Sequence, residues 1–159
     1  CARARAAARA PDARGVADCW DASHGLPHVG APLLLAQNFW DELQLDDILC
    51  FEGDRPRRAC PDAYLRAFKN ATVGQLAGLA ARGGRAGLWM PSCFAHTSDT
   101  CTAAATAVRG ARYGEALAAW LAPGGLEAPP VLLDDCVPAD GADPDVVPCN
   151  PVCSGCGGE

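Results

Sequence analysis

The sequence has no long hydrophobic segment. Half of its 159 residues are hydrophobic, yet no apolar run approaches the roughly 20 residues needed to span a bilayer. The apolar runs around 33–35 and 88–90 have the length of buried strands. The sequence therefore predicts no membrane span.

The sequence also lacks an excess of positive charge and any internal repeat. Its formal net charge is -6, whereas proteins that bind nucleic acid present a basic face to the phosphates. An Arg-rich stretch at 1–14 is a local exception, but it contains no aromatic residue that could stack on bases. We expect no nucleic-acid partner.

Cysteine, in contrast, is abundant. The chain has ten, and this even number spread along the sequence favours disulfides formed in an oxidising compartment. Asn70 begins the N-glycosylation sequon Asn70-Ala71-Thr72, which agrees with secretion. The sequence shows no signal peptide and starts at Cys1, so we expect a processed protein or a piece of a longer one. These features predict an extracellular or secretory-pathway location at the cell wall or cell surface.

Two residue groups have spacings that could suit a metal ion. Cys149, Cys153 and Cys156 could bind zinc, but in this composition disulfides are the favoured interpretation. His24 and His28 would share one helix face, but Gly25 and Pro27 between them disfavour a helix. We expect neither a metal nor a cofactor.

The order of elements predicts an α/β fold. Short apolar strands are expected at 31–36 and 86–90, with a helix from Asp62 to Gly83 between them. A second helix is expected from Thr102 to Leu121. The Pro-, Gly- and Asp-rich residues 122–159 predict an irregular tail held by its cysteines.

An acid follows the first predicted strand and a histidine follows the second. In α/β-hydrolases the catalytic triad follows the chain order Ser, Asp or Glu, His. Asp41 and His96 fit the last two places of that order, on loops at the carboxyl ends of adjacent parallel strands. By composition alone, Asp41 would instead be a solvated acid among Glu42, Asp46 and Asp47.

Three sequence blocks, in order along most of the chain, resemble the pectin acetylesterase and Notum carboxylesterase family. The segment Ser92-Cys93-Phe94-Ala95-His96 is similar to the one that presents that family's catalytic histidine. The stretch 38–44 is similar to its Tyr-Asp-x-x-Gln block, which carries the acid. Trp120, Asp135-Cys136 and Pro148-Cys149-Asn150 with Cys153 resemble the closing part of the family sequence.

The resemblance implies that residues 1–159 are the C-terminal part of an α/β-hydrolase-like esterase domain. Asp41 would orient His96, which would activate a serine for hydrolysis of a carboxylic ester, with O-acetyl groups on a pectin-like polysaccharide as the favoured substrate. The Notum branch instead removes a fatty acyl group from a protein. The sequence Phe94-Ala95-His96 favours the pectin acetylesterase branch, which acts on polysaccharide.

The sequence departs from the family at two points. Thr97 follows His96, where the family usually has Cys, and no serine lies in a Gly-x-Ser-x-Gly nucleophile elbow. We therefore expect the nucleophile on an N-terminal part, of the same protein or of another chain, that also completes the sheet.

Two other hypotheses remain open at this point. One is an esterase-like structural or interaction module without activity in an extracellular assembly. The other is an unrelated disulfide-rich secreted domain, for which no closeness between Asp41 and His96 is expected.

Overall fold

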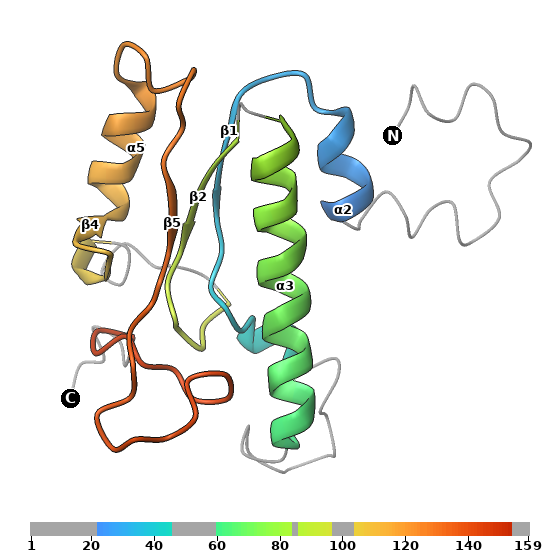
Figure 1. The fold of residues 1–159 in the computed structure, drawn as a ribbon, viewed down its shortest axis with the longest axis vertical. Helices are drawn as coiled ribbons and strands as arrows, with labels where there is room; N and C mark the ends of the chain where they lie inside the picture. Colours follow the sequence, from blue (N-terminus) through green and yellow to red (C-terminus); the bar gives the residue numbers. More distant parts are fainter. Residues whose placement is uncertain (1–21, 46–59, 84–85, 97–103, 154–159) are drawn as a thin grey trace, which may run out of the picture.

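Three parallel strands with a helix against each face form the centre of the structure (Figure 1). The computed structural model describes residues 22–45, 60–83, 86–96 and 104–153. In chain order the elements are α2 (Ala22–Gly25), the 3-10 helix η2 (Leu26–His28), β1 (Leu33–Ala36), α3 (Asp62–Gly83), β2 (Ala86–Met90), β3 (Ala107–Val108), β4 (Ala111–Arg112), α5 (Tyr113–Leu121) and β5 (Val131–Leu133). The mixed α/β class expected from the sequence is confirmed.

The sheet has the order β1-β2-β5, and both neighbouring pairs are parallel. Leu35 pairs with Leu88, and Trp89 pairs with Leu132 on the other side. The two expected strands and their parallel arrangement are thus confirmed. The tail, however, is not irregular throughout, because its residues 131–133 form the third strand.

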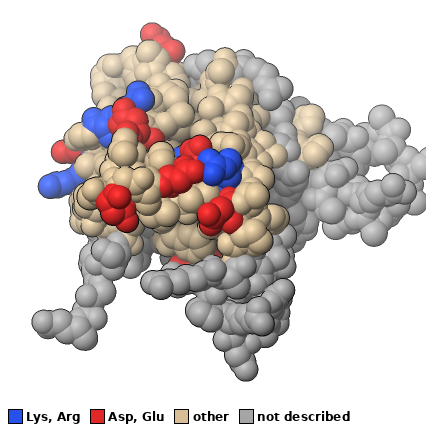
Figure 2. Space-filling model, turned by 60° about the horizontal axis from the view of Figure 1, so that its bottom comes forward, with Lys and Arg blue, Asp and Glu red and all other residues tan. Residues whose placement is uncertain are grey.

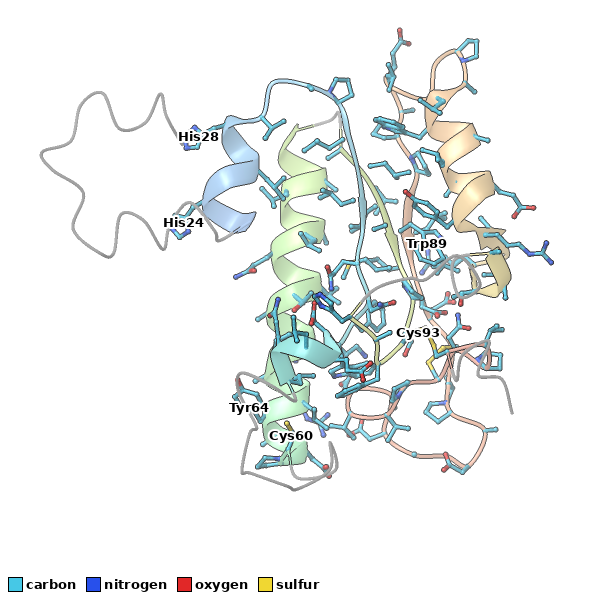
Figure 3. All side chains as sticks on the ribbon, turned by 180° about the vertical axis from the view of Figure 1, so that it is seen from behind. His24, His28, Cys60, Tyr64, Trp89 and Cys93 are labelled. Carbon is cyan, nitrogen blue, oxygen red and sulfur yellow. A yellow bond between two sulfur atoms is a disulfide. The ribbon has the colours of Figure 1, made fainter. Side chains whose placement is uncertain are left out.

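Side chains of β2 alternate between the two faces of the sheet, as the period of a strand requires. Leu88 and Met90 join the core beneath α3, whereas Trp89 packs with Val108 and Ala116 beneath α5. Trp89 points toward α5 in Figure 3, and its Nε1 donates a hydrogen bond to Ala111 O at 3.2 Å. The central strand is therefore covered on both faces, as in parallel sheets generally. The two strands expected from the sequence are not enough to build this sheet, and β5 supplies its third strand.

The first long helix agrees with the sequence pattern, and the second agrees only in part. α3 runs from Asp62 to Gly83, as its periodicity and terminal glycines predict. The helix expected over 102–121 is confirmed at 113–121, but residues 107–112 directly before it form the β3–β4 hairpin. At the hairpin turn, Arg109 and Gly110 both have positive φ, 51° and 82°. That is the requirement of the tight two-residue turn joining antiparallel strands.

One disulfide fastens the tail to the rest of the structure, and a second closes a loop within the tail. Cys93 is bonded to Cys153 and Cys136 to Cys149, so Cys149 and Cys153 are not zinc ligands. The expectation that cysteines hold the tail is confirmed.

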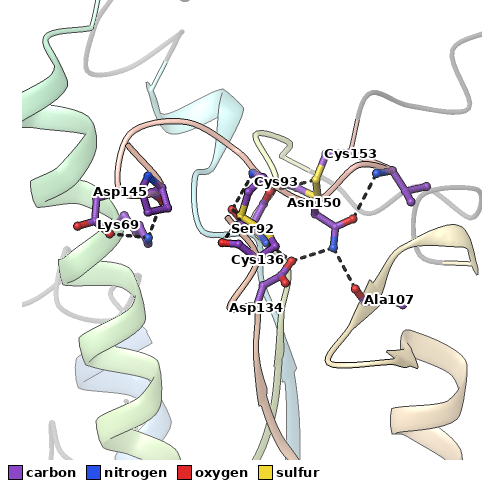
Figure 4. The surroundings of a disulfide bond; sticks show 12 residues. Lys69, Ser92, Cys93, Ala107, Asp134, Cys136, Asp145, Asn150 and Cys153 are labelled. Carbon is purple, nitrogen blue, oxygen red and sulfur yellow. Dashed lines mark hydrogen bonds and ion pairs between the residues drawn. A yellow bond between two sulfur atoms is a disulfide. The ribbon is translucent and has the colours of Figure 1, made fainter. Parts of the chain in front are cut away.

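A buried polar network lies beside these disulfides (Figure 4). Asp134 Oδ2 accepts from the Ser92 N–H at 3.0 Å and from Asn150 Nδ2 at 2.8 Å. Ser92 Oγ in turn accepts from the Cys149 N–H at 3.1 Å. The tail is therefore held by matched hydrogen bonds as well as by covalent links.

The loop enclosed by the second disulfide also contacts α3. Arg66 Nη2 lies 2.6 Å from Asp143 Oδ2, and Lys69 Nζ lies 2.7 Å from Asp145 Oδ1. Lys69 additionally donates to Pro144 O at 2.8 Å. On the face drawn in Figure 2, basic and acidic side chains are interspersed. The loop between Cys136 and Cys149, residues 137–148, is the Asp-, Pro- and Gly-rich segment of the sequence.

No helix in the described part of the chain has both the length and the hydropathy to cross a membrane.

The segment with His24 and His28 is helical despite Gly25 and Pro27, because it forms α2 and then the 3-10 turn η2. Both histidines lie on the outer side of this segment in Figure 3. Among the described residues, no group of three or more His, Cys, Asp or Glu side chains is placed to hold a metal ion.

Candidate functional site

The loops that follow β1 and β2 continue to hydrogen-bond after both strands have ended. Phe39 N–H donates to Pro91 O at 3.1 Å, and Trp40 N–H donates to Cys93 O at 3.3 Å. Ala95 N–H then donates back to Trp40 O at 3.2 Å. This parallel ladder brings the residues just beyond it, Asp41 and His96, to the same place.

Asp41 and His96 are in direct contact. The Nδ1 atom of His96 lies 2.9 Å from Asp41 Oδ1 and 3.1 Å from Oδ2, which is hydrogen-bond distance. The Asp41 side chain is 7% exposed and that of His96 is 48% exposed. The pair thus has a buried acid that orients an accessible imidazole, the arrangement in which a histidine can transfer protons to and from a bound molecule.

The Asp41 carboxylate is fixed from two further sides. Its Oδ1 accepts the backbone N–H of Gln44 at 3.0 Å, and Leu45 N–H donates to Asp41 O at 3.0 Å. Asp41 therefore caps the short helical turn that follows it. Gln37 Nε2 approaches Oδ2 at 3.5 Å, at the limit of a hydrogen bond. Gln44 thus anchors the acid through its backbone N–H. Sequence reasoning overlooked Gln37, although its position four residues before Asp41 could have indicated this contact.

The aromatic residues before Asp41 attach the acid loop to α3. Trp40 is fully buried, and its Nε1 donates to Leu65 O at 3.2 Å. Lys69 Nζ lies 5.1 Å from the centroid of the Phe39 ring and 5.5 Å from that of Trp40, within the range of a cation–π contact. Sequence reasoning did not single out Lys69, since nothing local in the sequence pairs it with residues 39–40.

Ser92 lies four residues before His96 in the sequence, but the structure gives it a different role. It is 0% exposed, and its hydroxyl accepts from Cys149 N–H in the network that holds the tail. A buried, hydrogen-bonded hydroxyl cannot reach a substrate, so Ser92 is not a nucleophile.

Asn70, the expected glycosylation site, lies in α3 and is exposed. Its accessibility is compatible with modification, which stays a prediction. Thr97, the departure from the family pattern beside His96, lies outside the described residues, as do Cys1, Cys156 and the acids Asp46 and Asp47.

Comparison of the chain with protein-family models, with curated proteins and with solved structures finds no match. The case for the site therefore depends on its own geometry and on the sequence resemblance.

Proposed function

We propose that this chain carries the acid and the base of a serine carboxylesterase with an α/β-hydrolase-like fold. The observation that supports this most directly is the contact of His96 Nδ1 with the buried Asp41 carboxylate, with the imidazole half exposed. Two parallel strands that present an acid and then a histidine at their carboxyl ends also follow the order of such enzymes.

The mechanism follows from which nitrogen contacts Asp41. A hydrogen bond from Nδ1–H to the carboxylate leaves Nε2 to accept the proton of a serine hydroxyl as it attacks an ester carbonyl. His96 would then return that proton to the leaving alkoxide and, in the second half-reaction, activate a water molecule against the acyl-enzyme. Asp41 would stabilise the imidazolium in both steps.

The nucleophile of this proposal comes from an N-terminal part outside this sequence. A nucleophile elbow would also supply backbone N–H groups for the oxyanion. The substrate class, an O-acetylated pectin-like polysaccharide outside the cell, is carried by the sequence resemblance, and the disulfides agree with that location.

The test is ester hydrolysis by the full-length protein, with a chromogenic acetyl ester and acetylated pectin as substrates. Removal of the base by His96→Ala, or of its orienting carboxylate by Asp41→Asn, should lower kcat by about 10⁴-fold or more. Glu42→Gln, which alters the neighbouring carboxylate, is the matched control and should retain activity. His96→Ala and Asp41→Asn variants that hydrolyse esters as fast as the Glu42→Gln control and the unchanged protein would refute the proposed roles.

An esterase-like module without activity is the second candidate, favoured by one observation. Asp41 already has a structural role as the cap of the turn at 42–45, so its burial does not require catalysis. A full-length protein whose nucleophile serine is replaced, or one that hydrolyses no ester with that serine intact, would establish this alternative.

A further inference from the structure

Asn38 is a buried polar side chain beside the Asp41–His96 pair. It lies between the end of β1 and Asp41 and is only 1% exposed. Its Nδ2 donates a hydrogen bond to Ala95 O at 2.8 Å, across 57 residues of sequence. Ala95 directly precedes His96, so this amide joins the acid loop to the backbone of the histidine loop.

Both polar groups of the Ala95 backbone are held by the acid loop. Its N–H donates to Trp40 O at 3.2 Å, and its C=O accepts from Asn38. The His96 ring itself is half exposed, so packing alone restrains it weakly. The orientation of the ring therefore depends on the Asp41 contact and on the Ala95 backbone from which it extends.

The oxygen of the Asn38 side-chain amide makes no such hydrogen bond within the described residues. Oδ1 is buried and has no hydrogen-bond partner among the described residues. A buried acceptor left without a partner is destabilising, and an apolar residue of the same size would avoid that cost. Asn38 is thus poorly explained as a contribution to stability and better explained by the one bond that its Nδ2 makes.

We propose that Asn38 is a positioning residue, whose Nδ2–Ala95 O hydrogen bond fixes the backbone before His96 so that Nδ1, rather than Nε2, faces Asp41. Its value for catalysis rests on the proposed function. The orientation itself is a property of this chain and can be measured without any ester substrate.

The experiment is ¹⁵N NMR of the imidazole nitrogens of the full 159-residue chain, about two pH units above the ordinary His pKa of about 6.5. At this pH the ring nitrogens report which tautomer is populated. His96 of the unchanged protein should be mainly in the Nδ1–H form. Asn38→Leu, which keeps the branched shape of the side chain but removes the donor, should turn His96 into a mixture of both tautomers. Val108→Ala, a change in the core beneath α5, should leave the tautomer unchanged.

A wild-type tautomer population in folded Asn38→Leu would overturn the proposal, whatever the esterase activity of the full-length protein. If the variant does not fold, hydrogen exchange in the unchanged protein decides instead. The Asn38 side-chain amide proton should then exchange at least about 100-fold more slowly than those of exposed Gln75. Equal exchange rates would show that the bond is not maintained, and would also overturn the proposal.

Discussion

Asn150 Nδ2 donates to both Asp134 Oδ2, at 2.8 Å, and Ala107 O, at 3.0 Å. One amide thereby joins the residue after β5 to the β3–β4 hairpin (Figure 4). Asp134 accepts from Ser92 N–H through the same oxygen, so the ends of β2 and β5 meet at this point.

Removal of this amide should destabilise the whole unit. Asn150 is 7% exposed, and Asn150→Ala leaves the half-buried Asp134 carboxylate and the Ala107 carbonyl each with one donor fewer. We expect the free energy of unfolding, measured with urea, to fall by about 1–3 kcal/mol. Gln75→Ala, at an exposed position of α3, should change it by no more than about 0.5 kcal/mol. Equal effects of the two changes would contradict a role of the network in stability.

Two glycines form a matched pair for testing the packing of the sheet. A Cβ at Gly87 would lie 2.9 Å from Leu34 Cδ1 and 3.1 Å from the backbone oxygen of Pro130, whereas a Cβ at Gly74 would meet nothing within 4 Å. Gly87→Ala should therefore destabilise the protein by about 1–3 kcal/mol. Gly74→Ala, within α3, should stabilise it by about 0.5–1 kcal/mol. Thermal unfolding of both variants checks the opposite signs.

The contact between Arg66 and Asp143 predicts a pH dependence of stability. The hydrogen bond from the Arg66 guanidinium holds the pKa of Asp143 below its ordinary value of 3.8. A carboxyl with a lowered pKa contributes stability above its unfolded pKa and loses that contribution as the pH falls through the folded value. Wild type should thus be more stable than Arg66→Gln at neutral pH, and this difference should vanish well below pH 3.8.

Both side chains of this pair are substantially exposed, 43% and 40%, so the difference should be small and should shrink with added salt. Asp143→Asn is the control: in that background the Arg66→Gln change should lose the pH-dependent part that Asp143 contributes. A wild-type advantage that persists undiminished at the lowest pH would contradict the assignment.

The two disulfides should differ in what they contribute. Cys93 and Cys153 are separated by 60 residues, and Cys136 and Cys149 by 13. Restriction of the unfolded chain predicts losses of about 4 and about 3 kcal/mol when each pair is replaced by alanine. Denaturant titration of the two double variants measures the order. A larger loss for the shorter loop would mean that native contacts of the tail, rather than the unfolded chain, determine the effect.

Much of the fold was predictable where the signal is local. The apolar segments of β1 and β2 and the helical periodicity of α3 identify themselves, and the polar residues that follow the strands place Asp41 and His96 at one edge. The hairpin at 107–112 was missed because helix-forming alanines surround it and only the Arg109–Gly110 turn marks it. β5 has three residues, so it exists through its pairing with β2, which no local pattern reveals.

The supporting contacts of the site were less predictable for the same reason. Asn38, Lys69 and Gln37 act through partners in three dimensions, and only Gln37 has its partner within one helical turn of sequence. The docking of Asp143 and Asp145 on α3 crosses more than 70 residues. Charge and composition alone would leave such acids in solvent.

The bond between Cys93 and Cys153 also imposes an order of events on a newly made chain. Cys93 lies three positions before His96, and its partner is added 60 residues later. At about 5–20 residues per second, the ribosome needs about 3–12 s to make that interval. During that time the Cys93–Cys153 bond cannot hold the histidine loop, so any association of this loop with the acid loop has to form without it. A chain oxidised before Cys153 has been added would therefore have only wrong partners for Cys93.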